Sequence, residues 1–202
     1  MSATPTRIVV LISGAGTLLQ ALIDAQQAGR LAGRIVAVGS DRDQAEGLAR
    51  AARAGIASFV LPLTGDRATW DEALTARIAD HAPDLVIGAG FMKLLGPAFL
   101  ARFGGRAINT HPSLLPAFPG QRAVADALAG GAASTGATVF LIDAGLDSGP
   151  ILAQQPVPVE PGDTVASLHE RIKVVERRLL VEVVNAWPAP PDASEDGLET
   201  TA

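Results

Sequence analysis

Three polar side chains could carry acid–base or oxyanion chemistry. Asn109 and His111 stand two residues apart, so in an extended segment their side chains lie on the same side. Together they offer an amide donor and an imidazole donor to one point, which suits a developing oxyanion. Asp147, in the segment Leu146-Asp147-Ser148-Gly149-Pro150, adds a carboxylate. Structural roles remain open, because a histidine at a strand end can complete local hydrogen bonds and an aspartate in a turn commonly stabilises it.

The segment Ser13-Gly14-Ala15-Gly16-Thr17 could bind an anion. It separates an apolar run, Ile8 to Ile12, from a helical pattern, and the free N–H groups at a helix start favour a phosphate. Leu19 stands where a dinucleotide fingerprint has its third glycine, so a nicotinamide cofactor is not expected. The alternative is a tight turn whose glycines only permit close packing.

The composition narrows the chemistry further. The 202 residues include no cysteine, which excludes a thiolate nucleophile, an iron–sulfur cluster, a disulfide and a cysteine zinc site, and no metal site is predicted. Of the three histidines, His81 and His169 fall on helical patterns with charged neighbours and are predicted to be solvated. The formal net charge is −5 and there is no Lys/Arg-rich run, so no nucleic-acid partner is expected.

An α/β fold is predicted to position these residues. Short β-branched runs alternate with helical patterns, which indicates a doubly wound, mostly parallel sheet. The predicted strands cover residues 8–12, 35–38, 58–61, 85–87, 107–109 and 137–142, with an edge strand at 151–157. The predicted helices cover residues 18–28, 45–54, 70–79, a short segment from Pro97, 123–129 and 165–187. Asn109 and His111 should therefore emerge at the carboxyl end of the sheet, where ligands bind in such folds.

One domain, residues 1–187, is predicted, and it ends in a long amphipathic helix. Prolines at positions 112, 116 and 119 make residues 111–120 an irregular loop. The acidic segment 188–202 is predicted to be a disordered tail. Since the run from Ile8 to Ile12 is too short for a membrane span or a signal sequence, a cytoplasmic protein without membrane association is expected.

Four motifs together resemble the folate-dependent phosphoribosylglycinamide formyltransferases of purine biosynthesis. They are Ser13-Gly14-x-Gly16, Ala89-Gly90-Phe91-Met92-Lys93-Leu94-Leu95, Asn109-x-His111-Pro112-Ser113-Leu114-Leu115-Pro116 and Leu146-Asp147-Ser148-Gly149-Pro150. Their order and spacing match over residues 7–187, and Phe118-Pro119-Gly120 resembles the glycinamide branch more than the methionyl-tRNA branch. The resemblance implies a single-domain, Rossmann-like formyltransferase fold with a long C-terminal helix.

The resemblance also implies a reaction. The amine of glycinamide ribonucleotide would attack the formyl carbon of 10-formyltetrahydrofolate, the folate co-substrate. Asn109 and protonated His111 would stabilise the oxyanion, while Asp147 would assist His111 and move protons through an ordered water. No metal and no covalent enzyme intermediate is implied. The implied partners are these small molecules and, as a homodimer, a second copy of the chain.

Two groups of binding residues are carried over by position. The residues implied for the nucleotide phosphate, ribose and glycinamide group are Gly14, Ala15, Gly16, Thr17, Leu18, Pro112 and Glu176. Those implied for the folate are Arg67 near its glutamate tail, Phe91, Met92, Lys93, Leu94, Leu95, Asn109, Asp143, Ala144 and Gly145. By sequence pattern alone, Glu176 is predicted to be a surface residue. A cis peptide at Leu115-Pro116 is also implied.

Four positions depart from the family pattern. Leu18 replaces the usual Asn and cannot donate a hydrogen bond through its side chain, and Lys93 replaces the usual Arg. Arg122 and Phe140 stand where histidines are common, which leaves His111 as the one imidazole expected near the chemistry. Arg122 is expected to add positive charge to the active-site loop.

Three other functions remain open. The chain could formylate another amine, such as that of an amino sugar nucleotide, or hydrolyse formyltetrahydrofolate, or only bind a nucleotide or folate. The hydrolases resemble this group but carry an additional N-terminal domain, for which residues 1–6 leave no room. Asn109, His111 and Asp147 together argue against a purely binding role.

Overall fold

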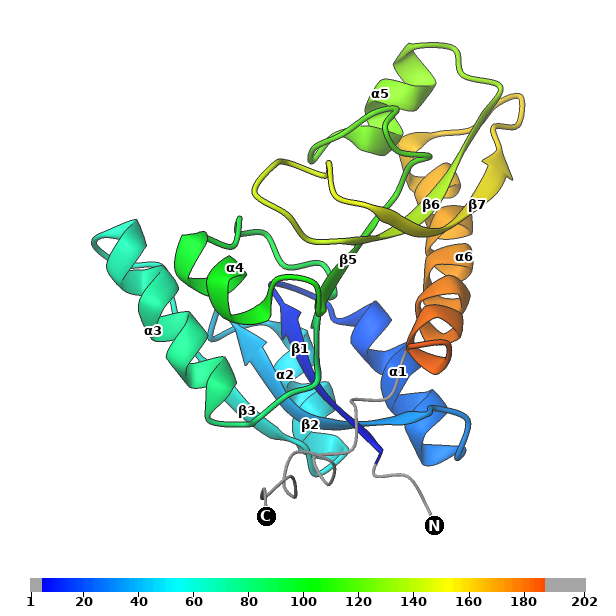
Figure 1. Cartoon of the computed structure of the whole chain (residues 1–202). Helices are drawn as coiled ribbons and strands as arrows, with labels where there is room; N and C mark the ends of the chain where they lie inside the picture. The colour runs from blue at the N-terminus through cyan, green and yellow to red at the C-terminus, as the bar shows by residue number, and fades with distance from the viewer. Residues whose placement is uncertain (1–4, 188–202) are drawn as a thin grey trace, which may run out of the picture.

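Seven strands form one mixed sheet in the order β3-β2-β1-β4-β5-β6-β7 (Figure 1). The structure, a computed structural model, describes residues 5–187. The strands are β1 (Thr6–Ile12), β2 (Gly33–Ser40), β3 (Ala57–Val60), β4 (Leu85–Gly88), β5 (Ala107–His111), β6 (Ser134–Leu141) and β7 (Ile151–Pro158). Strands β1 to β5 pair in parallel, and β6 and β7 pair antiparallel. The predicted mostly parallel α/β sheet is therefore confirmed.

Helices cover both faces of the sheet. They are α1 (Thr17–Gln27), α2 (Glu46–Arg53), α3 (Arg67–Ala79), α4 (Pro97–Phe103), α5 (Ala123–Ala129) and α6 (Val165–Asn185). Residues of α1, α2 and α6 belong to one hydrophobic core, and residues of α3 and α4 belong to the other. Figure 1 shows α3 and α4 on one side of the sheet and the long α6 on the opposite side.

The central strand β1 shows why its sequence is continuously apolar. All residues from Ile8 to Ile12 are fully buried. Ile8, Val10 and Ile12 pack into the core beneath α1 and α6, whereas Val9 and Leu11 pack into the core beneath α3 and α4. A strand that is buried on both faces needs apolar side chains at every position rather than at alternate positions.

The carboxyl ends of β1 and β4 bring two predicted binding segments together. β1 lies between β2 and β4, where the chain changes from one face of the sheet to the other. The Ser13 N–H donates to the Gly90 carbonyl (3.2 Å), and the Met92 N–H donates to the Ser13 hydroxyl (2.8 Å). The glycine segment after β1 and the segment Phe91 to Leu95 after β4 are thus joined directly.

Strand β5 is longer than predicted. Residues 108–111 pair antiparallel with residues 138–141 of β6, so the ladder extends through His111 and the irregular loop begins after it. Asn109 and His111 therefore lie on one face of a regular strand, as predicted. The Leu115-Pro116 peptide in the following loop is cis, as the resemblance implies.

The last helix is capped at its start and ends near its predicted position. The Ser167 N–H donates to the Thr164 hydroxyl and the Thr164 N–H donates to the Ser167 hydroxyl, a reciprocal capping box. α6 ends at Asn185, and the predicted tail, residues 188–202, lies outside the described residues. Within residues 5–187, no helix combines the length and the apolar character that crossing a bilayer requires.

Two histidines are less exposed than predicted. His81 lies just beyond α3, half-buried, with its ring stacked on Phe59 at a centroid distance of 5.7 Å. His169 lies on α6 but is also half-buried, and burial lowers its pKa. The prediction that both are solvated is wrong, because charged sequence neighbours do not report what packs against a side chain from another element.

Candidate active site

The His111 ring is held from both sides. Its Nε2 atom lies 2.8 Å from the Phe118 carbonyl oxygen, and its Nδ1 atom lies 3.4 Å from Oδ2 of Asp147. Both neighbours are hydrogen-bond acceptors, so a hydrogen on each ring nitrogen satisfies both contacts. The imidazole is buried, with 5% of its residue surface exposed. Both ring nitrogens of His111 therefore face hydrogen-bond acceptors inside the protein.

Backbone strain surrounds the same ring. Phe118 and Asp147 have φ angles of +54° and +52°, which non-glycine residues rarely adopt. Asp147 also accepts a hydrogen bond from the Gly120 N–H (2.8 Å), so its carboxylate ties the end of the 111–120 loop to His111. Strained backbone of this kind is characteristic of functional sites, where surrounding contacts hold it in place.

The Asn109 amide lies directly over a glycine of the neighbouring strand. Gly88 pairs with Asn109 across β4 and β5, and a Cβ atom at position 88 would come within 2.8 Å of Asn109 Oδ1. Gly88 therefore leaves the space in which the amide sits.

Replacing Gly88 with alanine should lower catalysis with little loss of stability. The methyl group would push the Asn109 amide away from its position, and a shift of about 1 Å can cost about 10²-fold in rate. We expect kcat to fall by about that factor, as measured by steady-state kinetics. In an Asn109→Ala background the same change should cost little more, whereas independent, additive losses would contradict the assignment.

A narrow cleft beside Asn109 gathers most of the predicted folate residues. The residues that line it are Gly88, Phe91, Lys93, Leu94, Leu95, Asn109, Phe140, Ile142, Asp143, Ala144, Gly145 and Asp147. Its volume is about 60 Å³, far below that of typical ligand pockets. Phe140 lines this cleft. The phenylalanine that replaces the family's common histidine at this position therefore packs against the other cleft residues.

Side chains from other elements hold the 91–95 segment. The Lys93 ammonium pairs with Oδ2 of Asp41 at 3.2 Å, and the Asp41 side chain is 1% exposed. The Arg67 guanidinium donates to the Leu94 carbonyl at 2.6 Å. Neither Arg67 nor Met92 lines the cleft; Arg67 is exposed at the start of α3, and Met92 is 51% exposed. A role for Arg67 at the folate tail would thus be at the entrance.

The glycine segment is fixed from behind by α2. The Gly47 N–H donates to the Gly14 carbonyl (3.1 Å), and the Arg50 guanidinium donates to the Ala15 carbonyl (2.8 Å). Gly16 has a φ of +67°, and a Cβ atom there would come within 2.7 Å of the Gly47 Cα atom. The carbonyl groups therefore point toward α2 and the helix start is left open.

The start of α1 has no protein cap. Gly16 is the N-cap and offers no side chain, and no described residue accepts a hydrogen bond from the N–H groups of Thr17, Leu18 and Leu19. The Leu18 side chain packs in the core with 8% of the residue exposed, so it does not face a ligand. Free N–H groups at the positive end of a helix form an anion site.

Glu176 is buried, which corrects the prediction of a surface residue. The residue is 5% exposed on the face of α6 that packs against β5. Burial raises its pKa to about 7, and a hydrogen bond with Thr110 and the charges of Lys173 and Arg177 oppose that shift. The carboxyl lies on the sheet face opposite Asn109 and His111, because Thr110 alternates with them along β5.

Glu176→Gln should change how stability depends on pH. Since the folded pKa is raised from 4.5 to about 7, the stability that protonated Glu176 contributes is complete below pH 4.5 and is lost as pH rises through 7. Glutamine does not ionise, so we expect the variant to gain on the parent by about 3 kcal/mol by pH 9. Urea unfolding at several pH values measures the difference, and parallel stability curves would contradict a buried, titrating Glu176.

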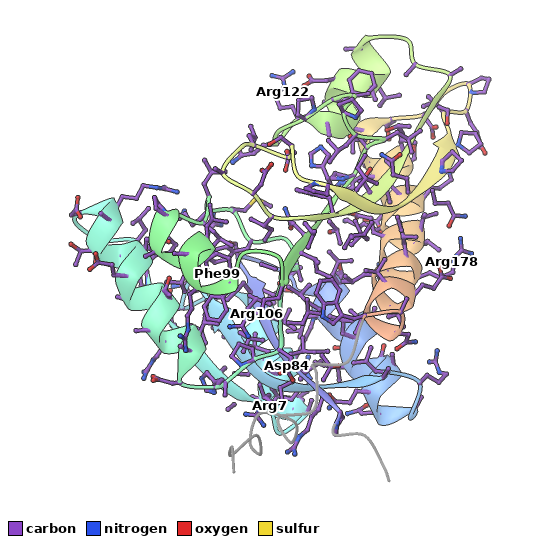
Figure 2. All side chains as sticks on the ribbon, in the orientation of Figure 1. Arg7, Asp84, Phe99, Arg106, Arg122 and Arg178 are labelled. Atoms are coloured by element: carbon purple, nitrogen blue, oxygen red, sulfur yellow. The ribbon has the colours of Figure 1, made fainter. Side chains whose placement is uncertain are left out.

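One residue that was a candidate for positive charge at the active site, Arg122, is exposed to solvent and already paired. The sequence predicts that Arg122 adds charge to the active-site loop, but its guanidinium pairs with Asp126 at 3.4 Å and its side chain is 79% exposed. Figure 2 places it at the outer end of the molecule, beside α5. Arg122 is the N-cap residue of α5, and Asp126 lies four residues later in the helix, so the two side chains can pair. Pro112 directly follows His111 at the end of β5 and is half-buried.

Several supporting residues are visible mainly in the structure. Asp41, Arg50, Gly88 and Thr110 each hold a predicted site residue, yet their partners are distant in sequence. Glu176 did leave a signal, because it occupies a position in the apolar stripe of α6 between Ile172 and Leu179. Among residues 5–187, no group of three or more acidic or histidine side chains could hold a metal ion.

Comparisons with known proteins identify formyltransferases as relatives of this chain. The profile of the formyl transferase family matches residues 6–184. A phosphoribosylglycinamide formyltransferase of Mycobacterium tuberculosis is 58% identical over 186 residues, covering 91% of this chain and 86% of the relative. The Escherichia coli K12 protein of the same name is 41% identical over 180 residues, covering 88% and 85% of the two chains.

Solved structures show the same relationship. Glycinamide ribonucleotide transformylase 1 from Symbiobacterium toebii superposes with a TM-score of 0.88 at 45% identity, covering 90% of this chain and 86% of that one. A formyltetrahydrofolate deformylase from Pseudomonas syringae pv. tomato superposes with a TM-score of 0.85 at 25% identity. The latter match covers 91% of this chain but 61% of the deformylase.

Proposed function

The chain belongs to the formyl transferase family, and we propose that it transfers the formyl group of 10-formyltetrahydrofolate to the amine of glycinamide ribonucleotide in purine biosynthesis. One observation carries the assignment to this site: Asn109 and Asp147, from β5 and a distant turn, line the cleft together with residues of the 91–95 segment, and His111 lies against Asp147 at 3.4 Å. The cleft is proposed to receive the folate, and the open start of α1 the nucleotide phosphate.

The geometry supports oxyanion stabilisation by the protein itself. When the amine attacks the formyl carbon, negative charge develops on the formyl oxygen. We propose that the Asn109 amide and a ring N–H of His111 donate hydrogen bonds to it. The Nδ1 contact to Asp147 at 3.4 Å is longer than the Nε2 contact to Phe118 at 2.8 Å, so Nδ1 is the nitrogen expected to exchange its contact for the oxyanion.

Once Nδ1 of His111 turns from Asp147 to the oxyanion, a carboxylate oxygen of Asp147 is free to accept a proton. The attacking amine must lose a proton, and the folate nitrogen must gain one as its bond to the formyl carbon breaks. A carboxylate at the cleft, through a bound water, can accept the first and return it to the leaving nitrogen.

We also propose that two copies of the chain associate as a homodimer, which sedimentation velocity would test.

A rate assay separates this function from its alternatives. Purified protein is mixed with a 10-formylfolate, and deformylation of the folate is followed by absorbance with and without glycinamide ribonucleotide. The proposal predicts turnover only with the nucleotide. Turnover without it would indicate a hydrolase, which the similarity to the deformylase makes the second candidate. Turnover with another amine alone would reassign the acceptor.

A further inference from the structure

A groove between α1 and α6 adjoins the open helix start. It has a volume of about 680 Å³ and is lined by Thr17 from the start of α1 and by four arginines, Arg30, Arg50, Arg177 and Arg178. Only two acidic side chains, Asp24 and Glu182, line it as well. In a chain whose formal net charge is −5, this groove is a local concentration of positive charge.

Two of the four arginines already have partners. Arg50 donates to the Ala15 carbonyl and to Gln20, and Arg178 pairs with Glu182 at 3.6 Å and donates to Gln155. Figure 2 shows Arg178 on the outer side of α6. Within residues 5–187, the guanidinium groups of Arg30 and Arg177 make no hydrogen bond or ion pair. These two remain available to bind an anion.

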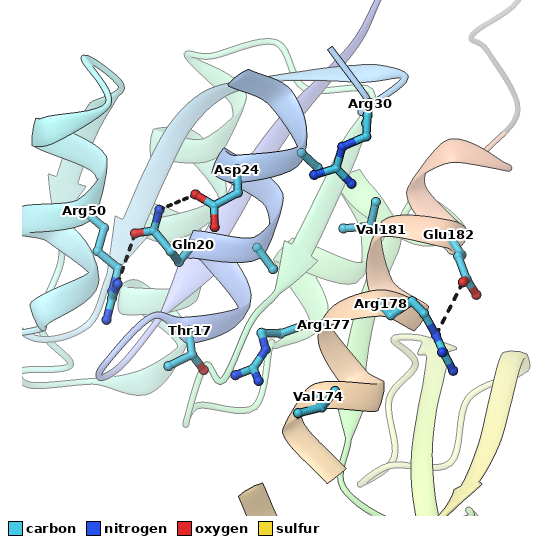
Figure 3. A pocket seen from close by; sticks show the side chains of 12 residues that line it. Thr17, Gln20, Asp24, Arg30, Arg50, Val174, Arg177, Arg178, Val181 and Glu182 are labelled. Carbon is cyan, nitrogen blue, oxygen red and sulfur yellow. Dashed lines mark hydrogen bonds and ion pairs between the residues drawn. The ribbon is translucent and has the colours of Figure 1, made fainter. Parts of the chain in front are cut away.

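Arg177 is the one next to the predicted phosphate position. Figure 3 shows its side chain reaching from α6 across the groove toward Thr17. Arg30 follows the far end of α1, about 16 Å away by the rise of an eleven-residue helix. Lys173, one turn earlier on the same face as Arg177, is paired with Glu170 at 2.8 Å.

We propose that Arg177 binds the phosphate of the nucleotide substrate, together with the free N–H groups and the Thr17 hydroxyl at the start of α1. This inference rests on the proposed function, for which it names a specificity-determining residue. A phosphate monoester carries nearly two negative charges near pH 7, and the guanidinium supplies paired donors that match its oxygens. Arg177 thereby supplies the side-chain contact that Leu18, buried in the core, cannot make.

Arg177→Gln should weaken nucleotide binding and leave the folate side intact. Loss of a charge-assisted contact to phosphate predicts a rise of about tenfold in KM for glycinamide ribonucleotide. KM for the folate and kcat at saturating nucleotide should change less than about twofold, because a contact made equally in both states affects KM alone. Arg177→Lys, which keeps the charge, should restore part of the loss.

Two matched controls test the location. Arg178→Gln removes the same charge from the next residue of α6, and Arg30→Gln removes it from the far end of the groove. Both should leave KM for the nucleotide within about twofold of the parent, because long-range attraction alone is screened beyond about 10 Å. Equal losses in all three variants, or none in Arg177→Gln, would overturn the proposal.

A binding measurement separates this inference from the reaction. The parent should show a rise in melting temperature with ribose 5-phosphate that Arg177→Gln largely lacks and Arg178→Gln keeps. If the parent transfers no formyl group but shows this pattern, the proposed function fails and the phosphate assignment survives. If formyl transfer occurs and the pattern is absent, the assignment of Arg177 fails alone.

Discussion

Replacing His111 with alanine is expected to lower kcat by about 10³-fold. The change removes both the donor for the oxyanion and the ring that Phe118 and Asp147 hold in place, and general acid–base groups typically contribute 10²–10⁴-fold. The folate cleft is lined by other residues, so the folate Kd should change little. Steady-state kinetics and fluorescence titration with the folate measure the two effects.

A second variant separates chemistry from folding. His111→Asn keeps a polar donor in a buried position but cannot contact Phe118 and Asp147 together, because its side chain is shorter. It should fold, with cooperative thermal unfolding, and remain at least 10²-fold slower than the parent. If either variant kept near-parental kcat, the imidazole would not be the catalytic group.

Replacing Asn109 with alanine is expected to lower kcat by about 10²–10³-fold, the loss typical of one oxyanion donor. The amide has no described hydrogen-bond partner within the protein and lines the cleft beside Asp147, so removing it should cost little stability. Steady-state kinetics with both substrates saturating measure the loss, and thermal unfolding checks the fold.

Asn109→Asp provides the sharper comparison. Aspartate keeps the shape of the amide but replaces the donor with a negative charge that repels the oxyanion. We therefore expect Asn109→Asp to be slower than Asn109→Ala. An aspartate variant more active than the alanine variant would mean that Asn109 acts by shape and not as a donor.

Local sequence patterns predicted the fold where packing is local. The run Ile8 to Ile12 is apolar at every position, and β1 is indeed buried on both faces. The extension of β5 through His111 could not be seen in this way, because it depends on pairing with residues 138–141 of β6. Where a strand ends because of its pairing with a neighbouring strand, the local sequence pattern does not predict that end.

The sequence indicates the candidate site residues but not the residues that hold them in place. The spacing of Asn109 and His111 placed both on one face of a strand, and the structure puts them there. The contact of Asp147 with Gly120, the Gly88 space beneath Asn109 and the Asp41 pair with Lys93 all join segments far apart in sequence. The residue type of Glu176 favours the surface, whereas its place in the apolar stripe of α6 favours burial, and the structure buries it.

The fate of the formyl carbon distinguishes formyl transfer from hydrolysis. Protein is incubated with 10-formyltetrahydrofolate labelled with carbon-13 in the formyl group and with glycinamide ribonucleotide, and the products are followed by NMR and mass spectrometry. We expect the label to appear on the glycinamide nitrogen at the rate at which folate is deformylated, and His111→Ala to slow both equally. Label released as formate, or no loss of formyl from the folate, would contradict the proposed function.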